Sequence, residues 1–264
     1  MRKLIFKTTA IAAGCALLLF GCRKNAKNEG TSTVSDEALA KIYNLGFSNK
    51  DVVSDGKGNY IVEGDILLSP ADLNSVPESQ FLRIGGEEQY RTTNLVRSLP
   101  RNITVSLASS LSTWSTALNT AISRYNALGL TITFTRVTSG ANISIVNGTG
   151  SFLASAGFPT SSGNPYNQII LVSTAVAGQP QNTVASILAH EMGHCIGFRH
   201  TDYFNRSYSC GGSAVNEGSA GVGAINIPGT PTGADPNSWM LSCIGSGQNR
   251  PFNANDKIAL NYLY

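Results

Sequence analysis

Residues 190–200 constrain this chain more than any other segment, because their sequence, HEMGHCIGFRH, contains all three of its histidines. If the segment is helical, His190 and His194 lie four residues apart, on one face and about 6 Å apart along the axis. Gly197 can adopt the left-handed conformation that ends a helix and turns the chain. Such a turn would bring His200 back toward the other two imidazoles. The spacing therefore predicts three histidines around one point.

A helix is expected to carry the first two of these histidines. Asn182 is a residue type that caps helices, and the apolar residues after it repeat at helical spacing. These apolar residues are Val184, Ile187 and Leu188. The pattern predicts a helix that begins at Asn182 and ends at Gly197.

Three imidazoles in this arrangement are typical of a catalytic zinc site. Two histidines at i and i+4 can bind one Zn²⁺ from the same side, and His200 would be the third ligand. Three protein ligands leave one position open for water, whereas structural zinc sites are closed by four. Glu191, beside His190, can act as the general base toward that water. The alternative is that the three histidines bind no metal and are ordinary surface or core residues. The position of His200, the glycine at 197 and the absence of histidine elsewhere in the chain argue against it.

The motif resembles the signature HExxHxxGxxH of the metzincin zinc peptidases. These peptidases also place a methionine-containing turn beneath the metal, and Met240, in the sequence Ser238-Trp239-Met240, fits that turn. The wider pattern looks most like the bacterial dual-action HEIGH metallopeptidases, with astacins as more distant relatives. The resemblance implies a zinc endopeptidase with an α+β, metzincin-like fold over residues 98–264. That fold has a mixed twisted sheet packed by two long helices, and a loop-rich lower subdomain that ends in a C-terminal helix.

Two positions near the motif differ from the astacin pattern. Ser242 stands where astacins and serralysins have a tyrosine that can reach the zinc, so no such ligand or oxyanion donor can be carried over. Thr201 stands where astacins have a glutamate. Asp202 follows, and it could either orient a ligand imidazole or be an ordinary surface-turn carboxylate.

The segments before the motif predict strands joined through helices, which gives a mixed sheet. Strands are expected at 103–108, 130–137, 142–146 and 168–172. A helix is expected at 114–129, with Trp114, Leu118, Ala121, Ile122 and Tyr125 on its buried face. By the resemblance, residues 151–158 form the edge strand on which metzincins hold an extended substrate, with an ordinary hairpin strand as the alternative.

The segments after the motif predict loops and one last helix. Residues 201–240 are rich in Gly, Pro, Asn and Ser, with little periodicity. Asn253, with Asp256 three residues on, is typical of a capped helix start. The buried face of that helix is expected to be Ile258, Ala259, Tyr262 and Leu263.

Residues 36–97 predict a prosegment-like region ahead of the peptidase domain. We expect a short helix at 35–44 and a hairpin at 51–68, turned at residues 55–58.

Asp65 is a candidate zymogen switch within that region. Astacin prosegments resemble it at a Phe-x-Gly-Asp motif whose aspartate occupies the open zinc position. By this analogy Asp65 would displace the catalytic water until the chain is cut between Arg83 and Arg97. Val62 replaces the phenylalanine, and an ordinary Gly-Asp turn is the alternative.

The N-terminus has the pattern of an export signal. Residues 1–21 have a basic start followed by an apolar run that is too short to span a membrane. The sequence before Cys22 resembles a bacterial lipobox, although Phe20 is larger than the residue preferred there. Cys22 is thus the expected lipidation site, and residues 22–35 predict a flexible tether. A plain signal peptide cut nearby is the alternative.

The charge balance and the cysteines fit an exported protein. Removing the three basic residues of the signal from the 19 Lys and Arg leaves 16, equal to the 16 Asp and Glu, so nothing suggests nucleic acid as a partner. In an oxidising compartment we expect a disulfide between Cys210 and Cys243, which lie in a loop-rich stretch and whose link would stabilise the fold by about 3–4 kcal/mol. Cys195 is expected to be a buried free thiol.

The sequence is consistent with two classes of function. The first is a zinc endopeptidase acting on protein or peptide, a monomer held by a lipid anchor in the bacterial cell envelope, with secretion as the alternative location. The second is a non-catalytic zinc-containing binding or adhesion lipoprotein. Glu191 argues against the second class, because a structural zinc site needs no base.

Overall fold

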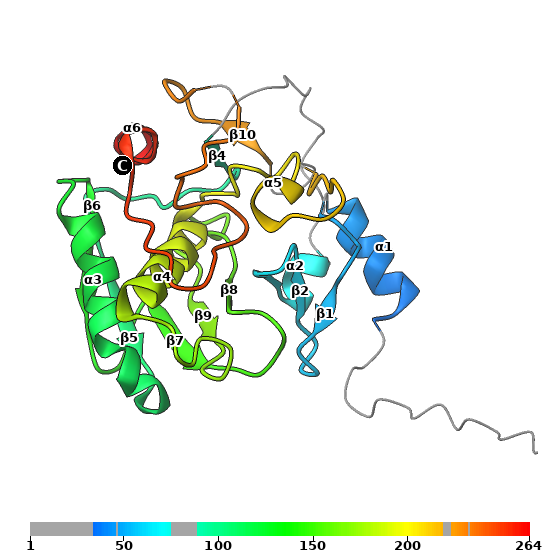
Figure 1. Ribbon diagram of the computed structural model, residues 1–264, viewed down its shortest axis with the longest axis horizontal. Coiled ribbons are helices and arrows are strands. Elements are labelled where there is room, and N and C mark those ends of the chain that lie inside the picture. Colours follow the sequence, from blue (N-terminus) through cyan, green and yellow to red (C-terminus); the bar gives the residue numbers. More distant parts are fainter. Residues whose placement is uncertain (1–33, 46, 75–88, 219–222, 232) are drawn as a thin grey trace, which may run out of the picture. The chain divides into compact units, whose positions relative to one another are not determined.

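An eight-stranded mixed sheet forms the framework of the chain, with strand order β1-β2-β3-β8-β9-β7-β5-β6 (Figure 1). The strands are β1 (Val53–Ser54), β2 (Tyr60–Val62), β3 (Ile66–Leu68), β5 (Arg101–Leu107), β6 (Ile132–Arg136), β7 (Ile143–Asn147), β8 (Ala154–Ala156) and β9 (Gln168–Leu171). β5, β6, β7 and β9 are parallel, whereas β8 runs antiparallel to β9. β4 (Tyr90–Arg91) and β10 (Ile225–Asn226) form a separate pair. The expected α+β class with a mixed sheet is confirmed.

The structure is a computed structural model that describes residues 34–45, 47–74, 89–218, 223–231 and 233–264, all within the unit Ser32–Tyr264. The signal segment, Cys22, most of the tether and the Arg83 end of the predicted activation segment lie outside the described residues. Within them, no helix combines the length and apolarity needed to cross a membrane.

Two helices pack against each other and share one core with the sheet. They are α3 (Ser115–Asn126), preceded by the 3-10 turn η1 (Ser109–Trp114), and α4 (Gln181–Ile196). The Tyr125 hydroxyl of α3 donates a 2.7 Å hydrogen bond to the Ala189 carbonyl of α4. Of the predicted α3 face, Ile122 is only half-buried and the other four residues are buried. This hydrogen bond holds α4, which carries the histidine motif, against α3.

The start of α4 differs from the prediction. The helix begins at Gln181, and Pro180, rather than Asn182, occupies the N-cap position without a side-chain bond. Pro180 sets an extended backbone there, and its carbonyl accepts from the amides of Thr183 and Val184. The Gln181 side chain instead bonds to η1 and α3, accepting from the Ala117 amide.

The C-terminal helix α6 (Ala254–Leu263) has the predicted cap and part of the predicted buried face. Asn253 and Asp256 form a reciprocal capping box, which confirms that prediction. Of the predicted face, Ala259 is buried and Leu263 packs half-buried against the core. Ile258 and Tyr262 are instead 43% and 57% exposed, and Leu260 is buried. The buried stripe therefore runs through Asp256, because its carboxylate accepts hydrogen bonds from the interior: the Gln89 side chain and the Trp239 amide.

The N-terminal region adds three strands rather than one hairpin. After α1 (Asp36–Asn44), β1 and β2 turn at the predicted position, and a second turn at 63–65 leads into β3. α2 (Pro70–Leu73) follows. These elements have a small apolar core of their own: Ile42, Leu45, Phe47, Val62, Ile66 and Leu68.

The predicted substrate-binding edge is not free in this structure. Only Ala154–Ala156 of the segment 151–158 form a strand, β8. β3 pairs with it in parallel, so that Ile66 lies opposite Ala156. The N-terminal region thus occupies the edge at which an extended peptide would pair.

Candidate active site

Helix α4 and the turn after it bring the three histidines together. His190 and His194 lie on one face of α4, with ring centroids 4.7 Å apart. Gly197 ends the helix with φ of 110°, and the space that a Cβ would need is filled by the Leu95 side chain and the Asn94 carbonyl. The turn places the His200 ring 4.9 Å from that of His194.

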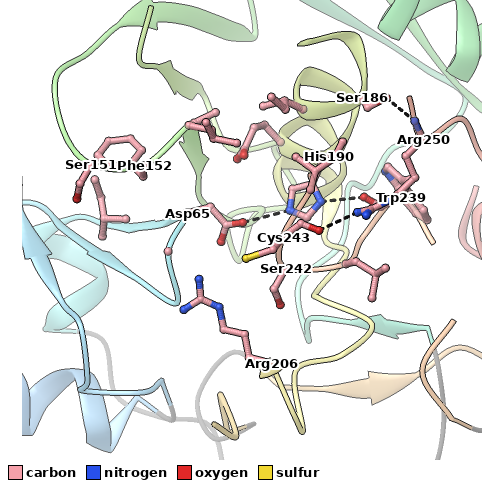
Figure 2. Close-up of a pocket in the computed structure, with 18 of the residues that line it drawn as sticks. Asp65, Ser151, Phe152, Ser186, His190, Arg206, Trp239, Ser242, Cys243 and Arg250 are labelled. Atoms are coloured by element: carbon pink, nitrogen blue, oxygen red, sulfur yellow. Dashed lines mark hydrogen bonds and ion pairs between the residues drawn. The ribbon is translucent and has the colours of Figure 1, made fainter. Parts of the chain in front are cut away.

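The Nε2 atoms of these rings converge with a carboxylate from the N-terminal region. Nε2 of His194 and Nε2 of His200 are 3.2 Å apart. Asp65 Oδ2 lies 3.2 Å from His190 Nε2, 3.0 Å from His200 Nε2 and 3.9 Å from His194 Nε2. Figure 2 shows Asp65 reaching His190 from the β2–β3 turn. The structure thus brings the three expected ligands and the expected switch residue to one point.

The opposite ring nitrogens show why this point suits a metal. His190 Nδ1 donates to the Trp239 carbonyl at 2.9 Å, and His194 Nδ1 donates to the Phe198 carbonyl at 2.8 Å. Burial lowers the pKa of His194 to about 4, so this ring is neutral and its Nε2 keeps a lone pair. The His194 lone pair and the Asp65 carboxylate oxygen face the Nε2 atoms of His190 and His200, and a bound cation would satisfy these two acceptors. Imidazole nitrogens held by such outer partners fit Zn²⁺.

Glu217, which the sequence reading missed, is the outer partner of His200. Its Oε1 and Oε2 lie 2.9 and 3.0 Å from His200 Nδ1. Burial alone would lower the pKa of His200, but the Asp65 and Glu217 carboxylates outweigh it and raise that pKa well above its ordinary value. The available signal was weak: Glu217 is the one acidic residue between Asp202 and Asp235 in an otherwise polar loop.

Replacing Glu217 with glutamine should weaken zinc binding about 10-fold or more, as is common for outer partners of metal-ligating histidines. Glutamine keeps the size of the side chain but removes the charge that holds the imidazole. Competition with a chelating dye measures the affinity. Asp235→Asn, in the same loop region but bonded to Asn253 and Asn255, is the matched control. Equal affinities of the two variants would contradict the role given to Glu217.

Asp202 fits neither of its two expected roles. It is buried, so it is no surface carboxylate, and it bonds to no histidine. Its Oδ1 accepts from the amide and hydroxyl of Ser242, and its Oδ2 accepts from the Ser209 hydroxyl. It therefore joins the Met240 turn to the loop after the motif, where Cys210 and Cys243 form a disulfide.

Met240 packs against α4. It is fully buried, and a Cβ on Gly193 of α4 would come within 2.7 Å of its sulfur. The amide of Thr201 donates to the Met240 carbonyl at 2.9 Å. The turn thus packs against α4, and its Trp239 carbonyl orients the His190 ring. Cys195, also on α4, is a buried free thiol whose pKa is raised by burial.

Glu191 faces the same cavity as His190. It is 2% exposed, and its Oε2 has no hydrogen-bond partner among the residues that the structure describes. Burial, reinforced by the charge of Asp65, raises the pKa of Glu191 well above its ordinary value. A buried carboxylate with a raised pKa suits proton transfer near neutral pH.

The cavity beside these groups has a volume of about 420 Å³ (Figure 2). Ile187, Leu241 and Ile244 give it apolar walls, and Arg206 and Arg250 also line it. Residues 151–154 border it on the side of β8. The site therefore joins a metal-binding cluster, a carboxylate base and a cleft large enough for a side chain.

Two structures of myroilysin are among the solved structures that are similar to this chain. One is 18% identical with a TM-score of 0.43, covering 65% of this chain and 96% of that one. The other is 15% identical with a TM-score of 0.40, covering 62% and 83%. The high choriolytic enzyme 1, a hatching enzyme zinc-protease from the medaka fish Oryzias latipes, is 17% identical with a TM-score of 0.35, covering 61% and 88%. No curated protein sequence matches the chain.

The family model of the dual-action HEIGH metallo-peptidases matches residues 61–264. The match covers most of the chain and includes the β2–β3 turn with Asp65 as well as the histidine motif. It identifies the protein as a zinc metallopeptidase, a hydrolase acting on protein or peptide. The chain belongs to the dual-action HEIGH metallopeptidase family.

Proposed function

We propose that this zinc metallopeptidase is an endopeptidase with His190, His194 and His200 as zinc ligands and Glu191 as general base. The observation that carries the proposal is the convergence of three Nε2 atoms next to a buried carboxylate, one oxygen of which is unpaired within the described ranges. When bound, zinc would lower the pKa of a coordinated water and polarise the scissile carbonyl. Glu191 then accepts the proton of the attacking water and passes it to the leaving amine.

The cleft supports cleavage within a peptide chain. β8 offers backbone groups to an extended peptide once β3 is removed, because strand pairing does not depend on the substrate side chains. The apolar walls of the cavity would receive one substrate side chain beside the scissile bond. Both features serve an internal peptide bond and need no free terminus.

In the uncleaved chain Asp65 would prevent this reaction. Its Oδ2 lies 3.2 Å from His190 Nε2 and 3.0 Å from His200 Nε2, beside the atoms that would hold the metal, and there it would exclude the attacking water. Burial alone would raise the pKa of Asp65, but the charge of His200 and the hydrogen bonds to the three histidines outweigh it, and the pKa falls well below the ordinary value. Asp65 is therefore ionised and is a strong competitor for the open metal position.

A non-catalytic member of the family, a binding or adhesion lipoprotein that keeps zinc only for structure, is the second candidate, favoured by one observation. Asp65 supplies a fourth acceptor, and four protein ligands are the arrangement of structural zinc. The two candidates differ after the N-terminal region is cut away, since only the peptidase then gains an open position.

The proposed location is the bacterial cell envelope, with Cys22 as the lipidated residue and a monomeric catalytic unit. The lipobox-like sequence before Cys22 and the Cys210–Cys243 disulfide, which requires an oxidising compartment, support this proposal. Secretion without the anchor is the alternative.

Incubating the processed protein with a proteome-derived peptide library, and reading the cuts by mass spectrometry, tests the proposed activity. An endopeptidase should produce internal cuts that disappear on chelation of zinc and return on its addition. Cuts confined to the terminal residues would refute the endopeptidase proposal, and no cuts at all would favour the non-catalytic candidate.

A further inference from the structure

The turn between β2 and β3 presents two carboxylates to the active-site region. Its three residues are Glu63, Gly64 and Asp65, and the first two have positive φ values of 57° and 92°. A positive φ is unfavourable for a residue other than glycine, so Glu63 needs contacts that hold it in place. A Cβ on Gly64 would meet the Arg206 guanidinium, which would have to move, and the positive φ of Gly64 itself favours glycine.

Glu63 has such contacts in a fully buried ion pair. Arg199 Nη2 donates to Glu63 Oε2 at 3.0 Å, and the side chains of both residues have no exposed surface. Glu63 Oε1 accepts from the Ser48 amide at 3.2 Å. Both carboxylate oxygens are therefore occupied, one by the catalytic region and one by the N-terminal region.

Arg199 depends on the N-terminal region in return. Its guanidinium lies 5.5 Å from the centre of the Phe47 ring, which belongs to the N-terminal apolar core. The next carboxylate, Glu217, is 3.8 Å from Nη2, farther than Glu63. Arg199 directly precedes His200, so the partner of Glu63 and a partner of Asp65 are neighbours in the chain.

We propose that Glu63 is a positioning residue which, through Arg199, fixes the turn so that Asp65 stays on the zinc ligands. The inference rests on the proposed function, in which Asp65 takes the open metal position of the uncleaved chain. Asp65 alone is one short side chain at the end of a hairpin. The ion pair of Glu63, two residues earlier, holds the turn in position, because its partner Arg199 is fixed directly before His200 in the chain.

The test uses the full-length, uncleaved chain with cobalt(II) in place of zinc. The absorption spectrum of bound cobalt(II) reports the number and type of its ligands. Glu63→Met keeps the volume of the side chain and removes both acceptors, whereas Glu63→Gln keeps one uncharged acceptor. Asp65→Ala gives the spectrum without the carboxylate. Asp55→Ala is the matched control, because it removes three hydrogen bonds from the β1–β2 turn without touching Arg199.

The Glu63→Met spectrum should shift most of the way to that of Asp65→Ala, with Glu63→Gln between it and wild type and Asp55→Ala unchanged. Peptidase activity of uncleaved Glu63→Met should rise at least about tenfold over uncleaved wild type, as expected on removing one partner of a buried pair. A wild-type spectrum for Glu63→Met, or an equal shift in Asp55→Ala, overturns the inference. If Asp65→Ala itself leaves the spectrum unchanged, the latency proposal fails with it. Spectral shifts without activity in any form would instead refute the peptidase function alone.

Discussion

Replacing Glu191 with glutamine is expected to lower kcat/KM of the processed enzyme by about 10²–10⁴-fold, the usual contribution of a positioned general base. Glutamine has nearly the same shape as glutamate but cannot accept a proton from the attacking water. Glu191 lies beside the ligand cluster, and within the described part of the chain its Oε2 has no hydrogen-bond partner, so that oxygen is available for proton transfer. The loss should fall on kcat rather than on KM.

Zinc content separates this loss from loss of the metal. The Glu191→Gln variant should retain zinc, because the expected ligands are the three histidines, whereas His200→Ala should lose most of it. Zinc content, by titration with a chelating dye, and the rate of peptide cleavage are measured on the same preparations. Equal cleavage rates for wild type and Glu191→Gln, at equal zinc content, would refute the assignment of the base.

The histidine motif could be interpreted from sequence because its geometry is local. A four-residue spacing on a helix and a glycine after it determine where His190, His194 and His200 lie, and the structure agrees. The strands before the motif were predictable for the same reason, since alternation of apolar residues reports a half-buried strand. The C-terminal cap at Asn253 is equally local.

Contacts between distant segments left no comparable pattern. Glu217 and Glu63 meet His200 and Arg199 across 17 and 136 residues, and no periodicity connects them. The buried face of α6 was predicted one residue out of register, because a polar residue, Asp256, is buried with its own partners. β8 was predicted as a free edge because the sequence does not show that β3 pairs with it.

In the uncleaved chain, Asp65→Ala should raise peptidase activity by about 100-fold, if the carboxylate blocks the site in about 99% of wild-type molecules. The side chain removed is the one whose oxygen lies 3.0 Å from His200 Nε2 and 3.2 Å from His190 Nε2. Alanine leaves the position open to water and keeps the hairpin strands intact. A quenched fluorescent peptide, with gel analysis to show that the chain stays uncut, measures the effect.

Activity of uncleaved Asp65→Ala should still be lower than that of the processed enzyme, because two obstacles act independently. Asp65 would take the open coordination position of the metal, whereas β3 occupies the strand edge of β8, where Ile66 pairs with Ala156. Short peptides that need little of the edge should therefore gain more from the substitution than long ones. If uncleaved Asp65→Ala is as inactive as wild type toward short and long peptides alike, the carboxylate does not confer latency, and pairing of β3 with β8 would be the remaining obstacle.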